Sequence, residues 1–216
     1  MVYGTPAYQP VKLPPAYVIC CEEFPEKELR AMGHFKAEGL LVKRVEGVHG
    51  EAWGLTTNHP YDIDDPENRF FVVPKHIGLH LAHWHIWCRI SETRNHPFNC
   101  TLILEDDAEF LPGWKARLEA ELHNLPADWD MLFLGSCNCE NKEKTNVKGN
   151  LWKVKPGPQC THAYLVNHKA IPTLIRTQKM AWAPIDLSLI FRSFPSLNIY
   201  TILPRIVVQH QQETEP

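Results

Sequence analysis

Thr101-Leu-Ile-Leu-Glu-Asp-Asp107 is the stretch of sequence that decides the fold. A short, fully apolar run such as 101–104 is typical of a strand buried on both faces of a parallel α/β sheet. Three carboxylates, Glu105, Asp106 and Asp107, follow it directly. In an open α/β sheet, ligands bind beyond the carboxyl ends of the strands. The stretch therefore predicts an α/β fold with an acidic site at the end of this strand.

The three acids point to a divalent cation. Burying all three without partners would be costly, because each isolated charge loses its hydration. Carboxylate oxygens suit Mg²⁺ or Mn²⁺, and these ions commonly share their coordination with substrate phosphates. The alternative is a solvated polar turn between Leu104 and the apolar pair Phe110-Leu111. The stretch alone leaves both interpretations open.

Composition is ordinary for a soluble globular protein: 44% of residues are apolar and 22% charged. A net charge of −3 gives no basic field of the kind that marks a general nucleic-acid binder. No signal peptide or membrane span is expected, and seven cysteines without a secretory signal indicate reduced thiols and a cytoplasmic location. We expect an irregular lead-in over 1–15, a single domain over 16–210 and a polar tail over 211–216.

Apolar periodicity and turn residues predict the elements. Strands are expected over 16–21, 41–48, 101–104, 130–135, 151–155, 163–166, 198–204 and 206–209. Helices are expected from Pro25, with an apolar stripe of Leu29, Met32, Phe35 and Leu40, and over 75–94, 111–125, 167–179 and from Pro184. Residues 54–74 are interpreted as a loop or lid over the site, and 138–150 as a mobile loop.

The helix predicted over 75–94 carries His76, His80 and His83 on one face. Three histidines at this spacing could bind zinc. Histidines on a buried helix are more often hydrogen-bonded to neighbouring groups, and we favour that interpretation. The apolar spacing of Ile77, Leu81, Trp84 and Cys88 predicts the buried side.

Seven ordered motifs resemble glycosyltransferase family 25, which includes lipopolysaccharide and collagen hydroxylysine galactosyltransferases. The resemblance covers about residues 16–210, and ordered motifs are more specific than any single one. The motifs are Val18–Cys21, Arg44–Gly50, Gly78–His83, Leu102–Asp107, Asp128–Gly135, Thr161–Val166 and Pro184–Asp186.

This resemblance implies a GT-A-like fold, α/β with a nucleotide-binding, mostly parallel central sheet flanked by helices. It implies an inverting transfer of a hexose from a nucleotide diphosphate sugar, with a uridine nucleotide favoured, to an acceptor hydroxyl. The metal, Mn²⁺ or Mg²⁺, is assigned to Glu105, Asp107 and His210. The donor is assigned to Cys20, Glu22, His49, Lys75, Gly78, Asp106 and Thr161. Cys20–Glu23 and His49-Gly50 depart from the asparagine, arginines and Asp-Gly usual in the family, which leaves the donor's identity open.

An inverting transfer needs a group that takes the proton of the acceptor hydroxyl. Metal-bound carboxylates are poor bases, because the cation drains their basicity. Asp186, at the start of a predicted helix, is therefore our first candidate, with helix capping as the alternative role. His162 and His83 are the other candidates.

Two other functions remain open. One is a metal-dependent nuclease or phosphohydrolase using His80, His83, Asp106 and Asp107. The other is a zinc module formed by Cys137, Cys139, Cys160 and His162, although reduced, partly buried cysteines explain that group better. The acceptor could be a glycan, a hydroxylated protein side chain or a modified nucleic-acid base, and a lysine-rich stretch over 142–155 keeps the last of these open.

Overall fold

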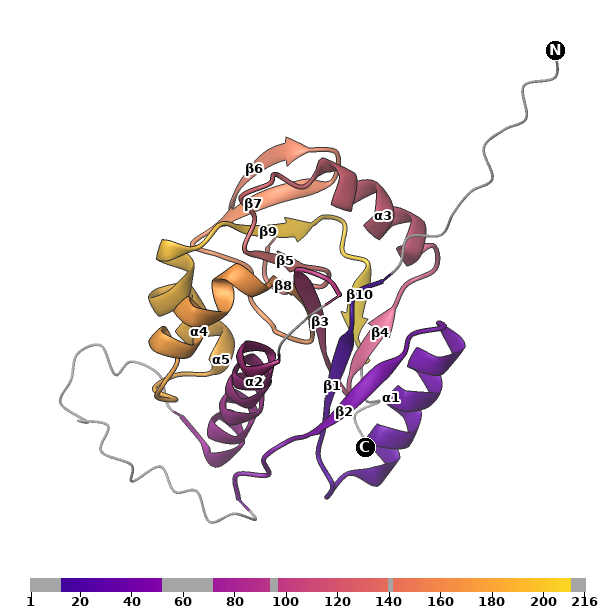
Figure 1. The fold of residues 1–216 in the computed structure, drawn as a ribbon, viewed down its shortest axis with the longest axis vertical. Helices are drawn as coiled ribbons and strands as arrows, with labels where there is room; N and C mark the ends of the chain where they lie inside the picture. Colours follow the sequence, from indigo (N-terminus) through magenta and orange to yellow (C-terminus); the bar gives the residue numbers. More distant parts are fainter. Residues whose placement is uncertain (1–12, 52–71, 94–96, 140–141, 211–216) are drawn as a thin grey trace.

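The computed structural model describes residues 13–51, 72–93, 97–139 and 142–210. Its centre is an eight-stranded sheet in the order β2-β1-β3-β8-β5-β9-β7-β6, with helices on both faces (Figure 1). The strands of this sheet are β1 (Ala16–Cys20), β2 (Val42–Glu46), β3 (Cys100–Glu105), β5 (Met131–Phe133), β6 (Glu143–Lys148), β7 (Leu151–Lys155), β8 (Ala163–Asn167) and β9 (Ile199–Ile202). A separate two-stranded sheet pairs β4 (Ala108–Phe110) with β10 (Val207–Gln209).

Most strands of the central sheet point the same way. β1 is parallel to β2 and β3, and β9 is parallel to β5. β8 runs antiparallel to both of its neighbours, β3 and β5. β7 is antiparallel to β9 and to β6, so only β8 and β7 are reversed. The predicted α/β fold with a mostly parallel central sheet flanked by helices is confirmed.

One face of the sheet is covered by α1 (Pro25–Ala37) and α3 (Trp114–Asn124). Phe35, Trp114 and Leu118 pack there against alternate residues of β1 and β3, including Val18 and Leu104. Burying a side chain of this size stabilises the fold by about 2 kcal/mol. These contacts fix β1 and β3 side by side, and with them the position of the acids that follow β3.

The opposite face is covered by α2 (Pro74–Glu92), α4 (Ile171–Thr177) and α5 (Ile185–Ser188), with the π-helical turn η2 (Leu189–Ser193) after α5. Two short 3₁₀ turns, η1 (His168–Ala170) and η3 (Phe194–Ser196), lie at the ends of this layer. Ile86 and Trp87 of α2 pack against Ile103 and Tyr164 of the sheet. Figure 1 shows α2 running beside the strands that carry the acids.

The second helix confirms the predicted 75–94 element but not its buried stripe. Leu81, Trp84 and Cys88 are only half-buried, whereas Ala82 and Ile86 are fully buried. The predicted stripe is therefore rotated from the true one, because apolar residues occupy several sides of α2 and their spacing alone does not choose the buried side. α2 also approaches the end of β2 closely: a Cβ on Gly78 would lie 1.9 Å from the carbonyl oxygen of Val48. Only glycine fits there.

Three other predictions need correction or fall outside the structure. Residues 143–148 form strand β6 and not a loop, and its side chains are all exposed. Leu29, predicted in the apolar stripe of the first helix, is 77% exposed, because α1 turns this side chain to solvent, and Leu41, predicted to begin the second strand, lies before β2 and is 94% exposed. The lid, the lead-in and the tail, apart from residues 72–74 and 13–15, lie outside the described residues. Among the helices that the structure describes, none combines the length and apolarity that a bilayer crossing requires.

Candidate active site

The acidic motif lies between β3 and β4, and β10 with His210 lies beside it. β4 and β10 are antiparallel, with Gln209 paired to Ala108. The side-chain Nε2 of Gln209 donates to Asp107 Oδ2 at 3.0 Å, and the backbone N–H of His210 donates to the Asp107 carbonyl at 2.6 Å. The structure therefore brings together Asp107 and His210, two of the predicted metal ligands. The His210 ring itself lies 3.1 Å from Glu109, through Nδ1.

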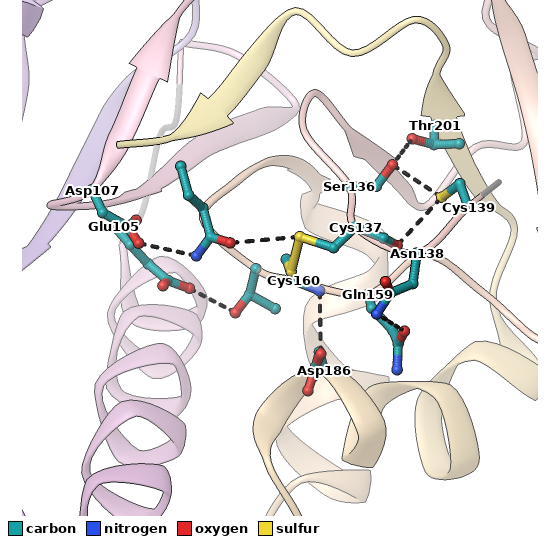
Figure 2. Close-up of a disulfide and its surroundings, with 12 residues drawn as sticks. Glu105, Asp107, Ser136, Cys137, Asn138, Cys139, Gln159, Cys160, Asp186 and Thr201 are labelled. Atoms are coloured by element: carbon teal, nitrogen blue, oxygen red, sulfur yellow. Dashed lines mark hydrogen bonds between the residues drawn. A yellow bond between two sulfur atoms is a disulfide. The ribbon is translucent and has the colours of Figure 1, made fainter. Parts of the chain in front are cut away.

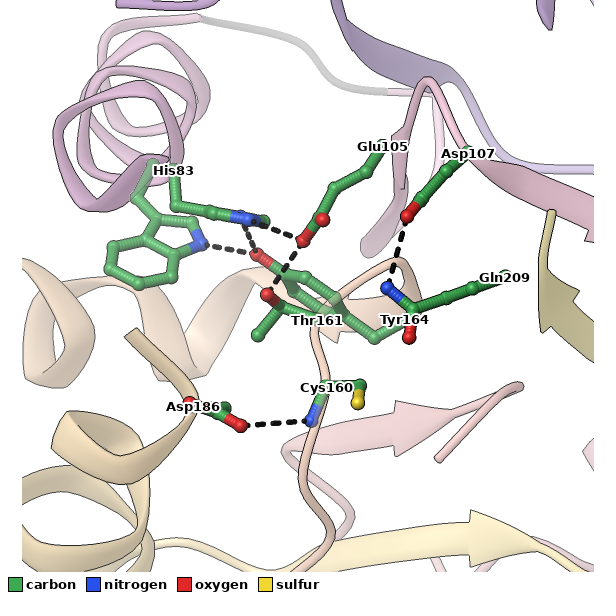
Figure 3. A network of polar contacts seen from close by, with 9 residues as sticks. His83, Glu105, Asp107, Cys160, Thr161, Tyr164, Asp186 and Gln209 are labelled. Atoms are coloured by element: carbon green, nitrogen blue, oxygen red, sulfur yellow. Dashed lines mark hydrogen bonds and ion pairs between the residues drawn. The ribbon is translucent and has the colours of Figure 1, made fainter. Parts of the chain in front are cut away.

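The third predicted ligand, Glu105, is held from inside the protein (Figure 3). Its Oε1 accepts hydrogen bonds from Thr161 Oγ1 at 2.6 Å and from His83 Nε2 at 3.1 Å. Burial tends to raise the pKa of Glu105, but the hydrogen bonds from His83 and Thr161 outweigh it, so the pKa lies below its usual value. Glu105 is therefore a charged group in a fixed orientation.

A chain of buried donors sets that orientation. Trp87 Nε1 donates to the Tyr164 hydroxyl at 3.2 Å, and this hydroxyl lies 2.9 Å from His83 Nδ1. The ionised Glu105 can only accept, so His83 Nε2 carries the proton of that bond, and in the neutral ring Nδ1 accepts the proton of the Tyr164 hydroxyl. The imidazole proton then sits on Nε2, where it donates to Glu105. His83 is fully buried with both nitrogens engaged, which favours a positioning role over proton transfer.

Asp107 has the opposite environment. Burial, followed by the charge of Glu105, raises the pKa of Asp107 to about 6. Its Oδ1 is buried and has no hydrogen-bond partner among the residues that the structure describes. Burial likewise raises the pKa of Asp106, with the cation of Lys27 acting against it. The partnerless Oδ1 of Asp107 offers one carboxylate ligand to a divalent cation, but the ligand atoms of Glu105, Asp107 and His210 are not among the sets of three that lie within 4.8 Å of one another in the described residues.

A cleft of about 180 Å³ opens next to these acids. Its lining includes three of the predicted donor-binding residues, His49, Lys75 and Asp106, together with Glu105. It also includes Phe24 and Lys27, which the sequence analysis missed. Lys27 Nζ lies 4.6 Å from the centre of the Phe24 ring, whose other neighbour is the His49 ring at 5.5 Å. Cations and an aromatic ring beside acids suit an anionic, aromatic ligand.

The remaining donor-binding predictions are not in the cleft lining. Cys20 is fully buried at the end of β1, and burial raises the pKa of its thiol to about 12. Glu22 is exposed and uses its backbone N–H on Glu46 Oε1 at 2.9 Å. Gly78 lies against the backbone carbonyl of Val48, and Val48 lines the cleft. Thr161, which precedes β8, donates a hydrogen bond to Glu105 Oε1.

Cys137 and Cys160 form a disulfide, with a Cα–Cα distance of 5.7 Å. The prediction of reduced thiols is wrong for this pair, and in this state neither sulfur is a zinc-binding thiolate. Cys139 is a free thiol, whose Sγ lies 3.2 Å from Ser136 Oγ and donates to the Cys137 carbonyl at 3.6 Å. Disulfides persist in oxidising compartments, so the cysteine content no longer supports a cytoplasmic location. His162, fully buried beside the disulfide, is not placed to meet an acceptor.

Asp186 lies on the other side of the disulfide. Its Oδ2 accepts from the backbone N–H of Cys160 at 3.2 Å, and its Oδ1 from that of Leu187 at 2.8 Å. The bond from Leu187 satisfies an N–H group in the first turn of α5, although the N-cap residue itself is Pro184, and the bond from Cys160 ties α5 to the segment before β8. The side chain is nevertheless only half-buried, as a base must be to reach an acceptor.

The three helix histidines have separate partners. His76 Nδ1 accepts from the Val73 N–H at 3.4 Å, and His80 Nε2 lies 2.8 Å from the Gln178 carbonyl. With His83 bonded to Tyr164 and Glu105, the interpretation as hydrogen-bonded core groups is confirmed. His80 is directed at Gln178 and not at the acids, so it does not form the site that a phosphohydrolase would need.

No protein-family model matches the chain, but curated relatives do. A "Glycosyltransferase 25 family member" of Aedes aegypti is 24% identical over 194 residues, which are 83% of this chain and 31% of the relative. The human "Inactive glycosyltransferase 25 family member 3" is 25% identical over 79% of this chain and 30% of its own length. The human "Procollagen galactosyltransferase 2" is 26% identical over 52% of this chain and 19% of its own length. The chain thus spans about a third of the length of the first two relatives.

Among solved structures, a glycosyltransferase involved in the glycosylation of the major capsid of PBCV-1 aligns over 88% of this chain and 83% of its own, with a TM-score of 0.46 and 11% identity. Mouse xyloside xylosyltransferase 1 aligns over 87% and 84%, with a TM-score of 0.41 and 8% identity. The resemblance first carried by the motifs is confirmed by the curated relatives: over most of its length this chain is similar to glycosyltransferase 25 family members.

Proposed function

We propose that this chain is a metal-dependent, inverting glycosyltransferase domain. It moves a hexose from a nucleotide diphosphate sugar, with a uridine nucleotide favoured, to an acceptor hydroxyl. The observation that carries the proposal is the acidic group at the end of β3, where the buried Oδ1 of Asp107 has no partner among the described residues, beside a cleft lined by Lys27 and Lys75.

The metal would be held by Asp107, Glu105 and His210. Glu105 would use the carboxylate oxygen that is not bonded to His83 and Thr161, and His210 the ring nitrogen that does not contact Glu109. A bound Mn²⁺ or Mg²⁺ supplies charge neutralisation for the donor diphosphate and its departure. Glu105 supports this assignment because the hydrogen bonds from His83 and Thr161 keep its carboxylate ionised and in a fixed orientation.

The donor would occupy the cleft. Lys27 and Lys75 offer ammonium groups to the diphosphate, and the Phe24 ring offers an apolar face to the base or ribose. The cleft lies where the strands β1 and β3 end, which is the usual ligand position in such sheets.

Asp186 is the proposed base. It would take the acceptor proton while its contacts with Cys160 and Leu187 hold the carboxylate in place. His162 and His83 are less suited, because both are fully buried.

The acceptor is proposed only as a hydroxyl compound. The name of the procollagen galactosyltransferase relatives supports testing galactose as the sugar and a hydroxylysine-containing collagen peptide as the first acceptor. Glycans and hydroxylated bases follow in the same screen.

The experiment measures UDP released from UDP-galactose and UDP-glucose with Mn²⁺, with and without acceptors. We expect turnover that EDTA abolishes and that Asp107→Asn lowers about 10²-fold or more. Glu92→Gln, an exposed acid at the end of α2, is the control and should be unaffected. Since some relatives are named inactive, UDP binding without any turnover would reject the transferase and leave a nucleotide-binding domain.

A further inference from the structure

The disulfide joins two segments that meet at the candidate site. Cys137 lies shortly after β5, and Cys160 lies shortly before β8, 23 positions further along the chain. The backbone N–H of Cys137 also donates to the Gln159 carbonyl at 3.0 Å. Because β8 is reversed relative to β3 and β5, the residues before β8 lie at the same edge as those that follow β3. The crosslink is therefore at the site edge of the sheet.

The crosslinked segments touch three of the candidate groups (Figure 2). The Cys160 N–H donates to Asp186 Oδ2, and the next residue, Thr161, donates to Glu105 Oε1. On the other side, Gln209 Oε1 lies 3.5 Å from Cys137 Sγ, while its Nε2 donates to Asp107 Oδ2. A disulfide sulfur carries no proton, so the contact with Gln209 is one of packing. Asp186 is thus bonded to Cys160 itself, Glu105 to the next residue, and Asp107 is connected to Cys137 only through Gln209.

The crosslinked backbone is held in an unfavourable conformation. Cys160 has φ = 66° and Asn138 has φ = 54°, both in the left-handed region that residues with a Cβ rarely adopt. Such conformations persist where the surroundings over-determine them. The sulfur–sulfur bond is a direct restraint on Cys160, so cleaving it frees the residue to return to an ordinary conformation. That return would move the Cys160 N–H and Thr161.

We propose that the Cys137–Cys160 disulfide positions the catalytic groups and makes the site redox-sensitive; this rests on the glycosyl-transfer function proposed above. In the oxidised chain Thr161 is held on Glu105 and the Cys160 N–H on Asp186. A dithiol reductant opens the bond: the disulfide gains two electrons and two protons to give two thiols, and the reductant becomes a disulfide. The reduced chain keeps its donor cleft but loses the alignment of the acids.

The test compares oxidised protein, protein reduced with dithiothreitol, and the Cys137→Ser/Cys160→Ser double variant. All are assayed with Mn²⁺ and UDP-galactose at a temperature where circular dichroism shows them folded. We expect kcat to fall about 10-fold or more on reduction, as for other misaligned sites, while KM and the Kd for UDP change less than about 3-fold. The double variant should match the reduced protein and ignore dithiothreitol. Cys88→Ser, which removes a half-buried free thiol, should behave as wild type.

Two results would overturn the proposal: full kcat in the reduced protein, or a loss of UDP binding in step with kcat, which would mean general unfolding. Hydrogen exchange of the Cys160 amide provides a readout that needs no activity, and reduction should speed it about 10-fold or more. If the oxidised protein turns over no donor, the transferase function fails. The amide measurement then still decides whether the disulfide holds this segment, and unchanged exchange rejects it.

Discussion

Asp107→Asn should stabilise the metal-free protein while it removes activity. Burial and the neighbouring Glu105 raise the pKa of Asp107 from 3.8 to about 6. In the unfolded chain the carboxyl ionises near its ordinary pKa, whereas the folded protein retains the proton until about pH 6. As the pH rises from about 4 to about 6, the folded state therefore loses stability, and above that range the loss is complete.

The magnitude follows from the shift of about 2 units, which corresponds to at most about 3 kcal/mol. We expect roughly half of this, 1–2 kcal/mol, because the carboxylate is only partly removed from solvent. Asparagine has the same shape, cannot ionise, and can still accept the hydrogen bond from Gln209. For a chain of this length the gain amounts to an increase of about 3–6 °C in Tm.

The assay is thermal unfolding in EDTA at pH 8 and at pH 4. The difference in Tm between Asp107→Asn and wild type should be largest at pH 8 and shrink towards zero at pH 4. Glu109→Gln, an exposed acid two positions further along the chain in β4, is the matched control and should shift Tm by less than about 2 °C. Added Mn²⁺ should raise the Tm of wild type but not of Asp107→Asn. An Asp107→Asn protein that melts at or below the wild-type temperature at pH 8 would refute the reasoning.

Three further predictions concern His80, Asp186 and Tyr164. Burial lowers the pKa of His80 to about 4, so as the pH falls the unfolded chain protonates this histidine before the folded chain does. The free energy of unfolding should therefore fall by up to about 3 kcal/mol as the pH drops from 6.5 to 4. Urea titrations of His80→Gln should lack that loss. Asp186→Asn should lower turnover about 10²-fold with UDP binding kept, and near-normal turnover would exclude Asp186 as the base. Tyr164→Phe removes the donor to His83 Nδ1, so the proton on Nε2 is no longer fixed. The affinity for Mn²⁺, measured by calorimetry, should fall about 10-fold. An unchanged affinity would mean that Tyr164 contributes only packing.

The sequence predicts the buried strands and long helices well, because runs of apolar residues mark the segments that are buried in the folded protein. The strand β6 was missed for the same reason: its residues 143–148 are polar and exposed, and only backbone pairing with β7 makes them a strand. The buried side of α2 was misjudged because apolar residues occupy several of its sides and their spacing alone does not choose the buried one. Edge strands and the buried side of such a helix are decided by tertiary contacts.

For the site, His49 and the acids 105–107 follow from the motifs, whereas Lys75 was assigned to the donor but lies in none of them, and the cleft gathers His49, Lys75 and Asp106. Phe24 and Lys27 were missed, although an aromatic residue and a lysine three positions apart, just after the first strand, were a usable signal. The Cys137–Cys160 pairing had no such signal, since cysteine connectivity cannot be read from spacing. The chain from Trp87 through Tyr164 to His83 joins residues 77 positions apart, and only the packed sheet brings them together.

The hydrogen bonds around Glu105 indicate the order in which the acids would be lost by mutation in a chain of this type that no longer needs its activity. Replacing Glu105 by an apolar residue would leave the donors of His83 and Thr161 buried without acceptors, at a cost of about 1–3 kcal/mol each. Losing the charge of Asp107 would instead relieve repulsion. Under mutation pressure without selection for catalysis, Asp107 is therefore the first acid expected to disappear, and Glu105 the last. A descendant that keeps Glu105 but lacks Asp107 should be read as a stable pseudoenzyme, and the remaining carboxylate as a relic of folding rather than of chemistry.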